Sequence, residues 1–208
     1  MDVSNPMADV VPSAHGPVLA VLAATTTPPT GRKIAELTEP RVSQPRVAHI
    51  LADLTDAGLV DRVQAGSASL FALNREHLAA GAVEELATVR TRLWNRISEH
   101  AAGWTHPPEA IVVYGSAARG DGGTASDIDL LVVRPGSVDE DDGDWQRDLT
   151  ALGFAVPRWT GNPCEILDRS PDQLRAMADA GERLLAEIRR DGRAVVGPLG
   201  AVPTPRAA

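Results

Sequence analysis

The sequence predicts an α+β protein in which two modules are joined by a long helix. Residues 12–76 combine helical spacing of apolar residues with two later strand-like runs, which predicts three helices followed by a β-hairpin. Residues 77–104 have the character of one linking helix. Residues 105–197 contain apolar runs, short helical segments and a Gly-rich turn, so we expect an α/β domain with a mixed sheet. Disordered tails are expected over residues 1–11 and 198–208.

The composition limits the protein class. The chain has 208 residues, of which 43% are hydrophobic and 23% charged, and its net charge is -8. This acidic balance argues against a general nucleic-acid coat protein but leaves room for a local DNA-reading surface. The only cysteine, Cys164, lies in an apolar run, which favours simple burial over a nucleophilic role. Because no long apolar run or signal peptide is visible, we expect a cytoplasmic protein.

The N-terminal module begins with two short helices. Residues 17–24 are apolar and start with a proline, which suits the first turn of a helix. Residues 31–39 form the second expected helix, which ends before Pro40.

The third helix of this module is the clearest. Ser43 is a good N-cap and Pro45 suits the first turn. The residues that follow place one apolar face at positions i, i+3, i+4 and i+7, made of Val47, Ile50, Leu51 and Leu54. Strand-like runs at 59–63 and 70–73 then surround a turn, so three helices and a hairpin together predict a winged helix-turn-helix.

One segment resembles the recognition helix and wing of bacterial winged-helix regulators of the ArsR and MarR types. Its sequence is SQPRVAHILADLTDAGLVDRVQAGSASLFAL. The resemblance implies that the third helix enters the major groove of DNA. Bases or phosphates would be contacted by Gln44, Arg46 and His49. The DNA backbone would lie near Arg62, together with Arg41, Gln64 and Ser67.

A protein-binding role for this module is the alternative. Winged helices also serve in dimerisation and protein binding, and Asp53 and Asp56 make the end of the third helix acidic. A lone exposed histidine such as His49 is usually neither a ligand nor a catalyst. The linking helix carries apolar residues at three- and four-residue steps and could support a homodimer.

The chemistry is concentrated in residues 111–133, IVVYGSAARGDGGTASDIDLLVV. The first apolar run predicts a buried strand that ends at Tyr114, and Ser116 can begin a short helix after it. In the second run, from Asp127 onward, side chains two positions apart share one face of a strand. Asp127 and Asp129 should therefore point the same way, while the apolar residues between and after them face the core.

Two carboxylates on one face suit a hard divalent cation, because Mg²⁺ prefers one or two carboxylates together with phosphate oxygens. Across the turn, Gly115 allows the backbone to come close to a ligand, and Ser116 with the free N–H groups of a helix start suits a phosphate. The residues themselves therefore predict phosphate on one side of the turn and a metal ion on the other.

The spacing Gly-Ser, ten residues, Asp-x-Asp resembles the polymerase-β-like nucleotidyltransferase superfamily, in particular its minimal nucleotidyltransferases. The likeness covers roughly the C-terminal half of the chain and includes the ending LLAEIRRDGRAVVGP. By this resemblance, Gly115 and Ser116 hold the nucleoside triphosphate, and Asp127 and Asp129 bind one or two Mg²⁺ ions. Glu165, in Cys-Glu-Ile-Leu, is the candidate third carboxylate, as metal ligand or base. The nucleotide-binding set is completed by Arg119 and Ser126.

The remaining elements of the second module follow from local patterns. The acidic run at residues 139–144 is interpreted as a solvated surface before a helix, since acidic residues suit a helix N-terminus. We then expect a helix at 145–152, strands at 154–156 and 164–167, a helix capped by Ser170, a helix at 182–190 and a strand at 193–197.

The resemblance implies a Mg²⁺-dependent enzyme that transfers NMP, most simply AMP from ATP, to a hydroxyl of a protein, an RNA or a small molecule, coupled to DNA binding. A partner toxin is one such protein acceptor, because some members of the superfamily are antitoxins that modify their toxins. Two alternatives stay open: an acidic hairpin without a site, and a transcriptional regulator whose second domain only senses nucleotide. No local motif indicates which acceptor is used, which nucleotide base is preferred or which oligomeric state forms.

Overall fold

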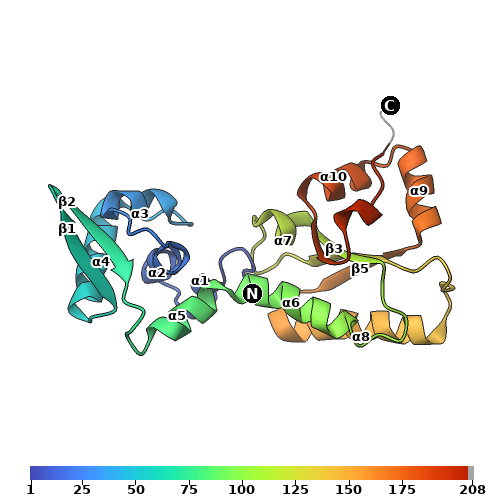
Figure 1. The fold of residues 1–208 in the computed structure, drawn as a ribbon, viewed down its shortest axis with the longest axis horizontal. Coiled ribbons are helices and arrows are strands. Elements are labelled where there is room, and N and C mark those ends of the chain that lie inside the picture. The colour runs from blue at the N-terminus through green and yellow to red at the C-terminus, as the bar shows by residue number, and fades with distance from the viewer. Residues whose placement is uncertain (206–208) are drawn as a thin grey trace. The chain divides into compact units, whose positions relative to one another are not determined.

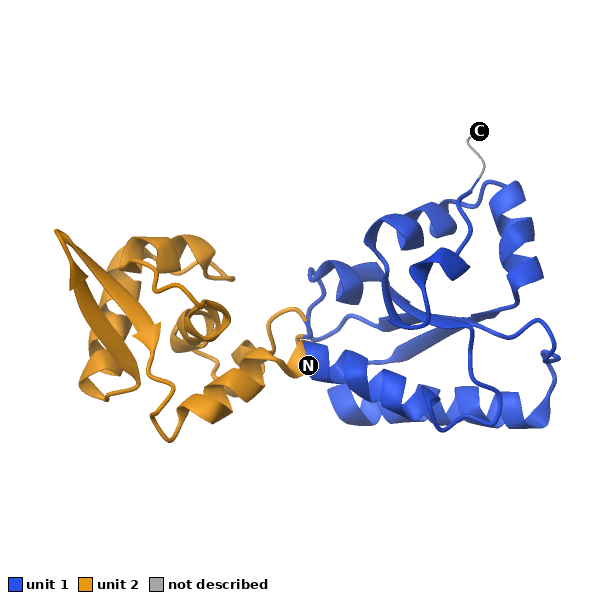
Figure 2. Cartoon of the chain, viewed as in Figure 1, with its two compact units in different colours: residues 1, 3, 91–208 blue, residues 2, 4–90 orange. Residues whose placement is uncertain are grey.

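The computed structural model describes residues 1–205 and divides into two compact units (Figures 1 and 2). The N-terminal unit contains residue 2 and residues 4–90, and the C-terminal unit contains residues 1 and 3 and the chain from residue 91 onward. No helix in the described part of the chain has both the length and the apolar character that crossing a bilayer requires.

The N-terminal unit is made of helices around one apolar core, with a hairpin beside them. Its elements are α1 (Pro6–Val10), α2 (His15–Ala24), α3 (Gly31–Leu37), α4 (Gln44–Asp56), β1 (Val60–Ala65), β2 (Ala68–Leu73) and α5 (Ala80–Ala87). The apolar face expected on α4 is buried in this core. β1 and β2 pair antiparallel, and Thr30 forms an isolated bridge with Leu70 that joins the segment before α3 to the hairpin.

The long linking helix expected over residues 77–104 is two helices. α5 ends at Ala87, and α6 (Val89–Ala101) begins after Thr88. The Thr88 hydroxyl donates to the carbonyl oxygens of Glu84 and Glu85, 3.1 and 3.0 Å away. A threonine that bonds the preceding turn in this way favours an interruption, and helical spacing alone does not reveal it.

The C-terminal unit is a mixed four-stranded sheet between two helical layers (Figure 1). After α6, its elements are β3 (Ala110–Tyr114), α7 (Gly115–Arg119), β4 (Ile128–Val133), α8 (Gly143–Thr160), β5 (Cys164–Arg169), α9 (Pro171–Asp179), α10 (Arg183–Asp191), β6 (Arg193–Val196) and the 3-10 turn η1 (Leu199–Ala201). The strand order is β5-β4-β3-β6, with β4 and β5 parallel and the other pairs antiparallel. One face packs against α6 and α8, and the other against α9 and α10.

Two elements differ from the sequence-based expectation. Residues 154–156, expected as a strand, lie inside α8, because the buried residues Trp145, Leu149, Leu152 and Val156 continue one helical face. β4 begins at Ile128, so Asp127 precedes the strand rather than lying in it.

The expected tails contain structure in their described parts. In the first, residues 6–10 form α1 and Met7 is buried. In the second, η1 follows β6 and Val202 is buried in the core beside α9 and α10. Apolar side chains in these short segments find partners that neither the polar composition of the first tail nor the Pro- and Ala-rich composition of the second reveals. Residues 206–208 of the second tail lie outside the described residues.

Candidate active site

The site is organised by close contact between Gly115 and Asp129. β3 ends at Tyr114, which pairs with Asp129 on β4, and Gly115 follows with φ of +66°. A Cβ atom at Gly115 would lie only 2.2 Å from the Asp129 Oδ2 atom. The carboxylate therefore occupies the space that any other residue would fill, and both the positive φ and this contact require glycine.

Three carboxylates lie near enough to influence one another at this end of the sheet, although within residues 1–205 no three such groups are close enough to hold an ion by themselves. Asp129 and Glu165 are register partners on the parallel strands β4 and β5, so they lie on the same face, the one that α9 and α10 cover further along. Burial raises the pKa of the Asp129 carboxyl above its usual range, and the negative charges of Asp127 and Glu165 raise it further, against a smaller opposing effect of Arg119. A cation bound here would relieve this repulsion.

The donor set fits a metal ion that is shared with a ligand. Within residues 1–205, no three His, Cys, Asp or Glu side chains stand close enough together to hold an ion by themselves. Mg²⁺ commonly takes only one or two protein carboxylates and completes its shell with phosphate oxygens and water. Asp127 and Asp129, the two carboxylates expected to hold the ion, match that number.

Ser116 is covered by the Gly-rich turn. A Cβ atom at Gly122 would lie 2.9 Å from the Ser116 Oγ atom and 3.3 Å from the Ser126 Cβ atom, so this turn folds back closely over Ser116. The Asp121 N–H donates to the Ser116 carbonyl at 3.2 Å, and the Gly123 N–H donates to the Ser126 hydroxyl at 2.9 Å. The residues expected to bind phosphate and nucleotide, Ser116 and Ser126, are thus brought together by the turn.

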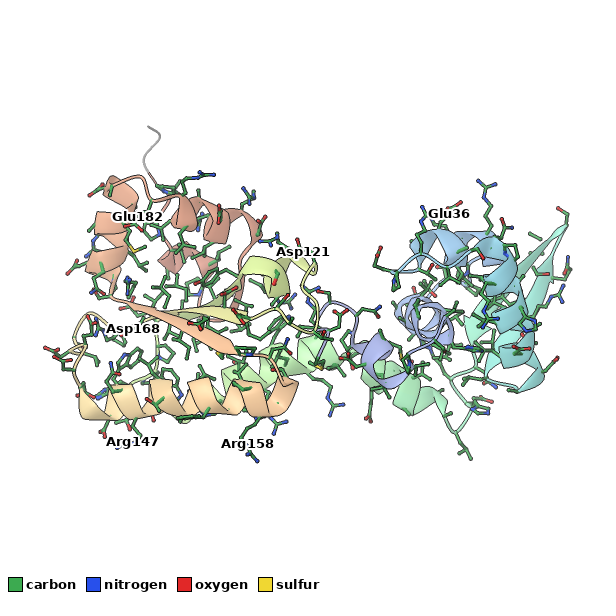
Figure 3. All side chains as sticks on the ribbon, turned by 180° about the vertical axis from the view of Figure 1, so that it is seen from behind. Glu36, Asp121, Arg147, Arg158, Asp168 and Glu182 are labelled. Carbon is green, nitrogen blue, oxygen red and sulfur yellow. The ribbon has the colours of Figure 1, made fainter. Side chains whose placement is uncertain are left out.

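Arg119 lies at the end of α7, with an exposed side chain. Its Nε atom donates to Asp121 Oδ2 at 3.0 Å, and Figure 3 labels Asp121 beside this helix. The guanidinium charge also opposes the rise in the pKa of Asp129, although burial dominates that shift. Arg119 therefore provides a positive charge near the carboxylates, which fits its expected place in the nucleotide-binding set.

Two residues of the site were missed by sequence reasoning. Tyr114 is half-buried on the same sheet face as Asp129 and Glu165, and burial, followed by those two charges, raises the pKa of its hydroxyl. The signal available in the sequence was that Tyr114 lies two positions after Val112 on one strand, so the two side chains share a face. Asn162 is fully buried and bonds the backbone just before Asp127. An asparagine after a helix reads locally as an ordinary turn residue, so nothing indicated this contact.

Cys164, for which simple burial was expected, is partly buried against the core of the C-terminal unit. Burial, followed by the charges of Glu165 and Asp129, raises the pKa of its thiol to about 12. The thiol therefore stays protonated at neutral pH and is a poor nucleophile.

The residues expected to contact DNA lie on two elements of the N-terminal unit. Gln44, Arg46 and His49 are exposed on α4, and His49 lies 3.6 Å from Asp53. On the hairpin, Arg62 donates to the Ser69 hydroxyl at 3.0 Å, and that hydroxyl donates to Gln64. A hollow of about 450 Å³ beside the start of α4 is lined by Arg32, Ala35, Glu36, Arg41, Val42, Ser43 and Gln44.

Comparison with known proteins identifies the C-terminal unit. Residues 91–188 match the nucleotidyltransferase domain family, a range that includes the sheet strands β3, β4 and β5 and all three carboxylates. No curated protein matches the chain.

Three solved structures are similar at low TM-scores. A toxin-antitoxin complex with AMP-PNP has 19% identity and a TM-score of 0.36, covering 50% of this chain and 73% of that chain. A mutant of the toxin-antitoxin MntA-HpeT has 19% identity and a TM-score of 0.34, covering 50% and 72%. TrmBL2, an archaeal chromatin protein with a novel mode of DNA binding, has 14% identity and a TM-score of 0.31, covering 90% and 78%. Scores this low do not define a shared fold. The family match therefore places a nucleotidyltransferase domain at residues 91–188 of this chain.

Proposed function

We propose that the C-terminal unit transfers NMP, most simply AMP from ATP, to an acceptor hydroxyl in a reaction that needs a divalent cation. The proposal rests on the Asp129 carboxylate, which packs against the Gly115 backbone. Burial, followed by the charges of Asp127 and Glu165, raises the pKa of this carboxyl. Nucleotidyl transfer depends mainly on positioning and on neutralising charge. A preorganised carboxylate cluster beside a Gly-Ser turn supplies both.

Each residue has a defined task in this reaction. Asp127 and Asp129 hold the cation, which when bound neutralises charge on the phosphate oxygens. Ser116, with Arg119 and Ser126 nearby, holds the triphosphate. The acceptor oxygen attacks the α-phosphorus, the bond to the β-phosphate oxygen breaks, and pyrophosphate leaves. Glu165, which is exposed at the edge strand, accepts the proton of the attacking hydroxyl.

The N-terminal unit is proposed to be a winged helix-turn-helix that binds DNA. Support comes from the order of α2, α3 and α4 followed by a hairpin, and from exposed polar residues on α4. Phosphate contacts would come from Arg46 and Arg62. Coupling of the two units would make the enzyme a regulator of its own expression, and the acceptor would be a protein such as a partner toxin, an RNA or a small molecule.

A second candidate function is a regulator that binds nucleotide without transferring it. The observation in its favour is that no three metal-ligating side chains converge within residues 1–205. Two carboxylates and phosphates are enough to bind a metal-nucleotide complex, whereas turnover also needs Glu165 to act at the acceptor. The two candidates therefore differ in whether the nucleotide is consumed.

The first experiment is a labelling assay. Purified protein is incubated with Mg²⁺, each of four α-labelled nucleoside triphosphates and host lysate as the acceptor pool. We expect one nucleotide to label an acceptor, and we expect the variant carrying both Asp127→Ala and Asp129→Ala to produce no label. The matched control is Glu187→Gln, which removes an exposed carboxylate on α10 and should label as the unmodified chain does.

The labelled species identifies the acceptor class. Label resistant to nuclease and sensitive to protease indicates a protein, the reverse indicates RNA, and label in the small-molecule fraction indicates a metabolite. Metal-dependent nucleotide binding without any labelled product would replace the transferase with the sensor. Equal labelling by the double variant would show that these aspartates are not the site.

A further inference from the structure

Asn162 lies in the short connection between α8 and β5, and its side chain has no exposed surface. Its backbone N–H donates to the Thr160 hydroxyl at 3.1 Å, and that hydroxyl donates to the Val156 carbonyl at 2.9 Å. The connection is thus tied to the last turn of α8. A buried amide side chain is costly unless its polar atoms are paired, so its partners indicate why it is there.

The partners of this side chain belong to the turn that carries the active site. The Nδ2 group donates to the Ser126 carbonyl at 2.8 Å and lies 3.4 Å from the Thr124 carbonyl oxygen. The Oδ1 atom accepts from the Met1 amino group at 3.0 Å. The NH₂ group faces two carbonyl oxygens and the amide oxygen faces an ammonium group. If the amide were flipped, all of these contacts would be lost, so the orientation is fixed.

A second hydrogen bond lies on the other side of Asp127. The Ile128 N–H donates to the Pro163 carbonyl at 2.8 Å. The peptide groups on both sides of Asp127 are therefore bonded to residues 162 and 163. Asp127 itself is exposed and lies before the first residue of β4, so these two bonds, rather than strand pairing at its own position, hold its backbone.

We infer that Asn162 is the positioning residue for Asp127: its side chain fixes the backbone before Asp127 so that this carboxylate stands beside Asp129. The inference rests on the proposed role of Asp127 in holding the cation. Groups that orient a ligand without touching the metal commonly change metal affinity or activity by about 10–100-fold when removed. Asn162 supplies one of the two bonds that hold the backbone at Asp127, so an effect in that range is expected.

Two substitutions remove this interaction in different ways. Asn162→Leu has a similar volume and removes the donor group. Asn162→Asp keeps the shape but turns an acceptor toward two carbonyl oxygens. The matched control is Ser170→Ala, which removes the capping hydroxyl of α9 in the same unit but bonds no residue of the turn.

The test uses the full chain and measures three quantities: thermal unfolding, binding of Mn²⁺ with ATP by calorimetry, and amide hydrogen exchange. We expect both Asn162 variants to bind Mn²⁺ with ATP about 10–100-fold more weakly and to exchange faster at residues 124–128. Ser170→Ala should lower thermal stability and leave binding unchanged. If Asn162→Leu unfolds, the isosteric Asn162→Asp variant decides.

The outcomes separate this inference from the proposed function. If the unmodified chain binds Mn²⁺ with ATP and Asp127→Ala abolishes binding, while folded Asn162 variants bind normally, the positioning role is overturned and the proposed function stands. If the unmodified chain binds Mn²⁺ with none of the four nucleoside triphosphates, the proposed function fails, and the inference that depends on it fails too.

Discussion

The two compact units hold their candidate functional side chains in contrasting ways. In the C-terminal unit, Asp129 is packed against a glycine backbone, and Asp127 is flanked by hydrogen bonds from residues far along the chain. In the N-terminal unit, Gln44, Arg46 and His49 are exposed on one face of α4, while the opposite face is buried. Chemistry on a bound nucleotide needs fixed groups, whereas a surface that meets DNA needs accessible ones.

This contrast implies different sensitivity to substitution. A rigid site loses function when its supporting backbone moves, even if every catalytic residue is kept. An exposed surface loses one contact at a time, and the rest of the unit is unaffected. Three substitutions test the contrast, and they are ordered here from the largest expected effect to the smallest.

Gly115→Ala should have the largest effect. The added Cβ would lie 2.2 Å from the Asp129 Oδ2 atom, and alanine is strained at φ of +66°. We expect transferase activity to fall by about 100-fold or more, because the carboxylate must move. The measurement is the rate of labelled product formation.

Gly123→Ala is the matched control, since a Cβ there meets nothing within 4 Å. It should retain activity, and DNA binding should be the same in both variants. Normal activity in Gly115→Ala would mean that the position of Asp129 does not matter, and the contrast between the units would be lost.

Arg46→Ala should have an intermediate effect that is confined to the N-terminal unit. Loss of one phosphate contact is expected to weaken binding to a duplex from the upstream region of its own gene. In a plot of the logarithm of the binding constant against the logarithm of salt concentration, the slope should become shallower by about 1. Arg75→Ala, which removes an equal charge from a residue paired with Glu84, should leave the slope unchanged. Binding of the unmodified chain without any salt dependence would contradict a DNA-reading surface.

Asp129→Asn should have the smallest effect of the three, which is a change in thermal stability, and it tests the electrostatic side of the contrast. Burial and the charges of Asp127 and Glu165 raise the pKa of Asp129 in the folded protein above its ordinary value. The folded state therefore binds this proton more tightly than the unfolded state, and stability falls as the pH rises through the raised pKa. We expect Asp129→Asn, without metal or nucleotide, to unfold at a higher temperature than the unmodified chain at pH 7.

The pH dependence of this gain supplies the control. Below the ordinary pKa of aspartate, Asp129 is protonated in both states, so the gain should vanish in acid. Asp139→Asn, at an exposed position on the acidic loop, should give no gain at pH 7. A lower unfolding temperature for Asp129→Asn at pH 7 would show that the carboxylate stabilises the fold.

Much of the local structure could be predicted from the sequence, because it depends on spacing within one element. The buried face of α4, the strand that ends at Tyr114, the short helix after it and the capping box of α9 all follow from residues a few positions apart. The Gly-Ser and Asp-x-Asp residues were also visible, since a fixed spacing carries their chemistry.

Other features were decided by tertiary packing. The helix through residues 154–156 depends on which competing local pattern packs better against the core. Glu165 meets Asp129 because β5 pairs with β4 in one particular parallel register. Asn162 reaches the turn before Asp127 because α8 ends beside it. Spacing within a segment determines which face a side chain occupies, but only the register and packing of distant segments determine which backbone or charge it meets there.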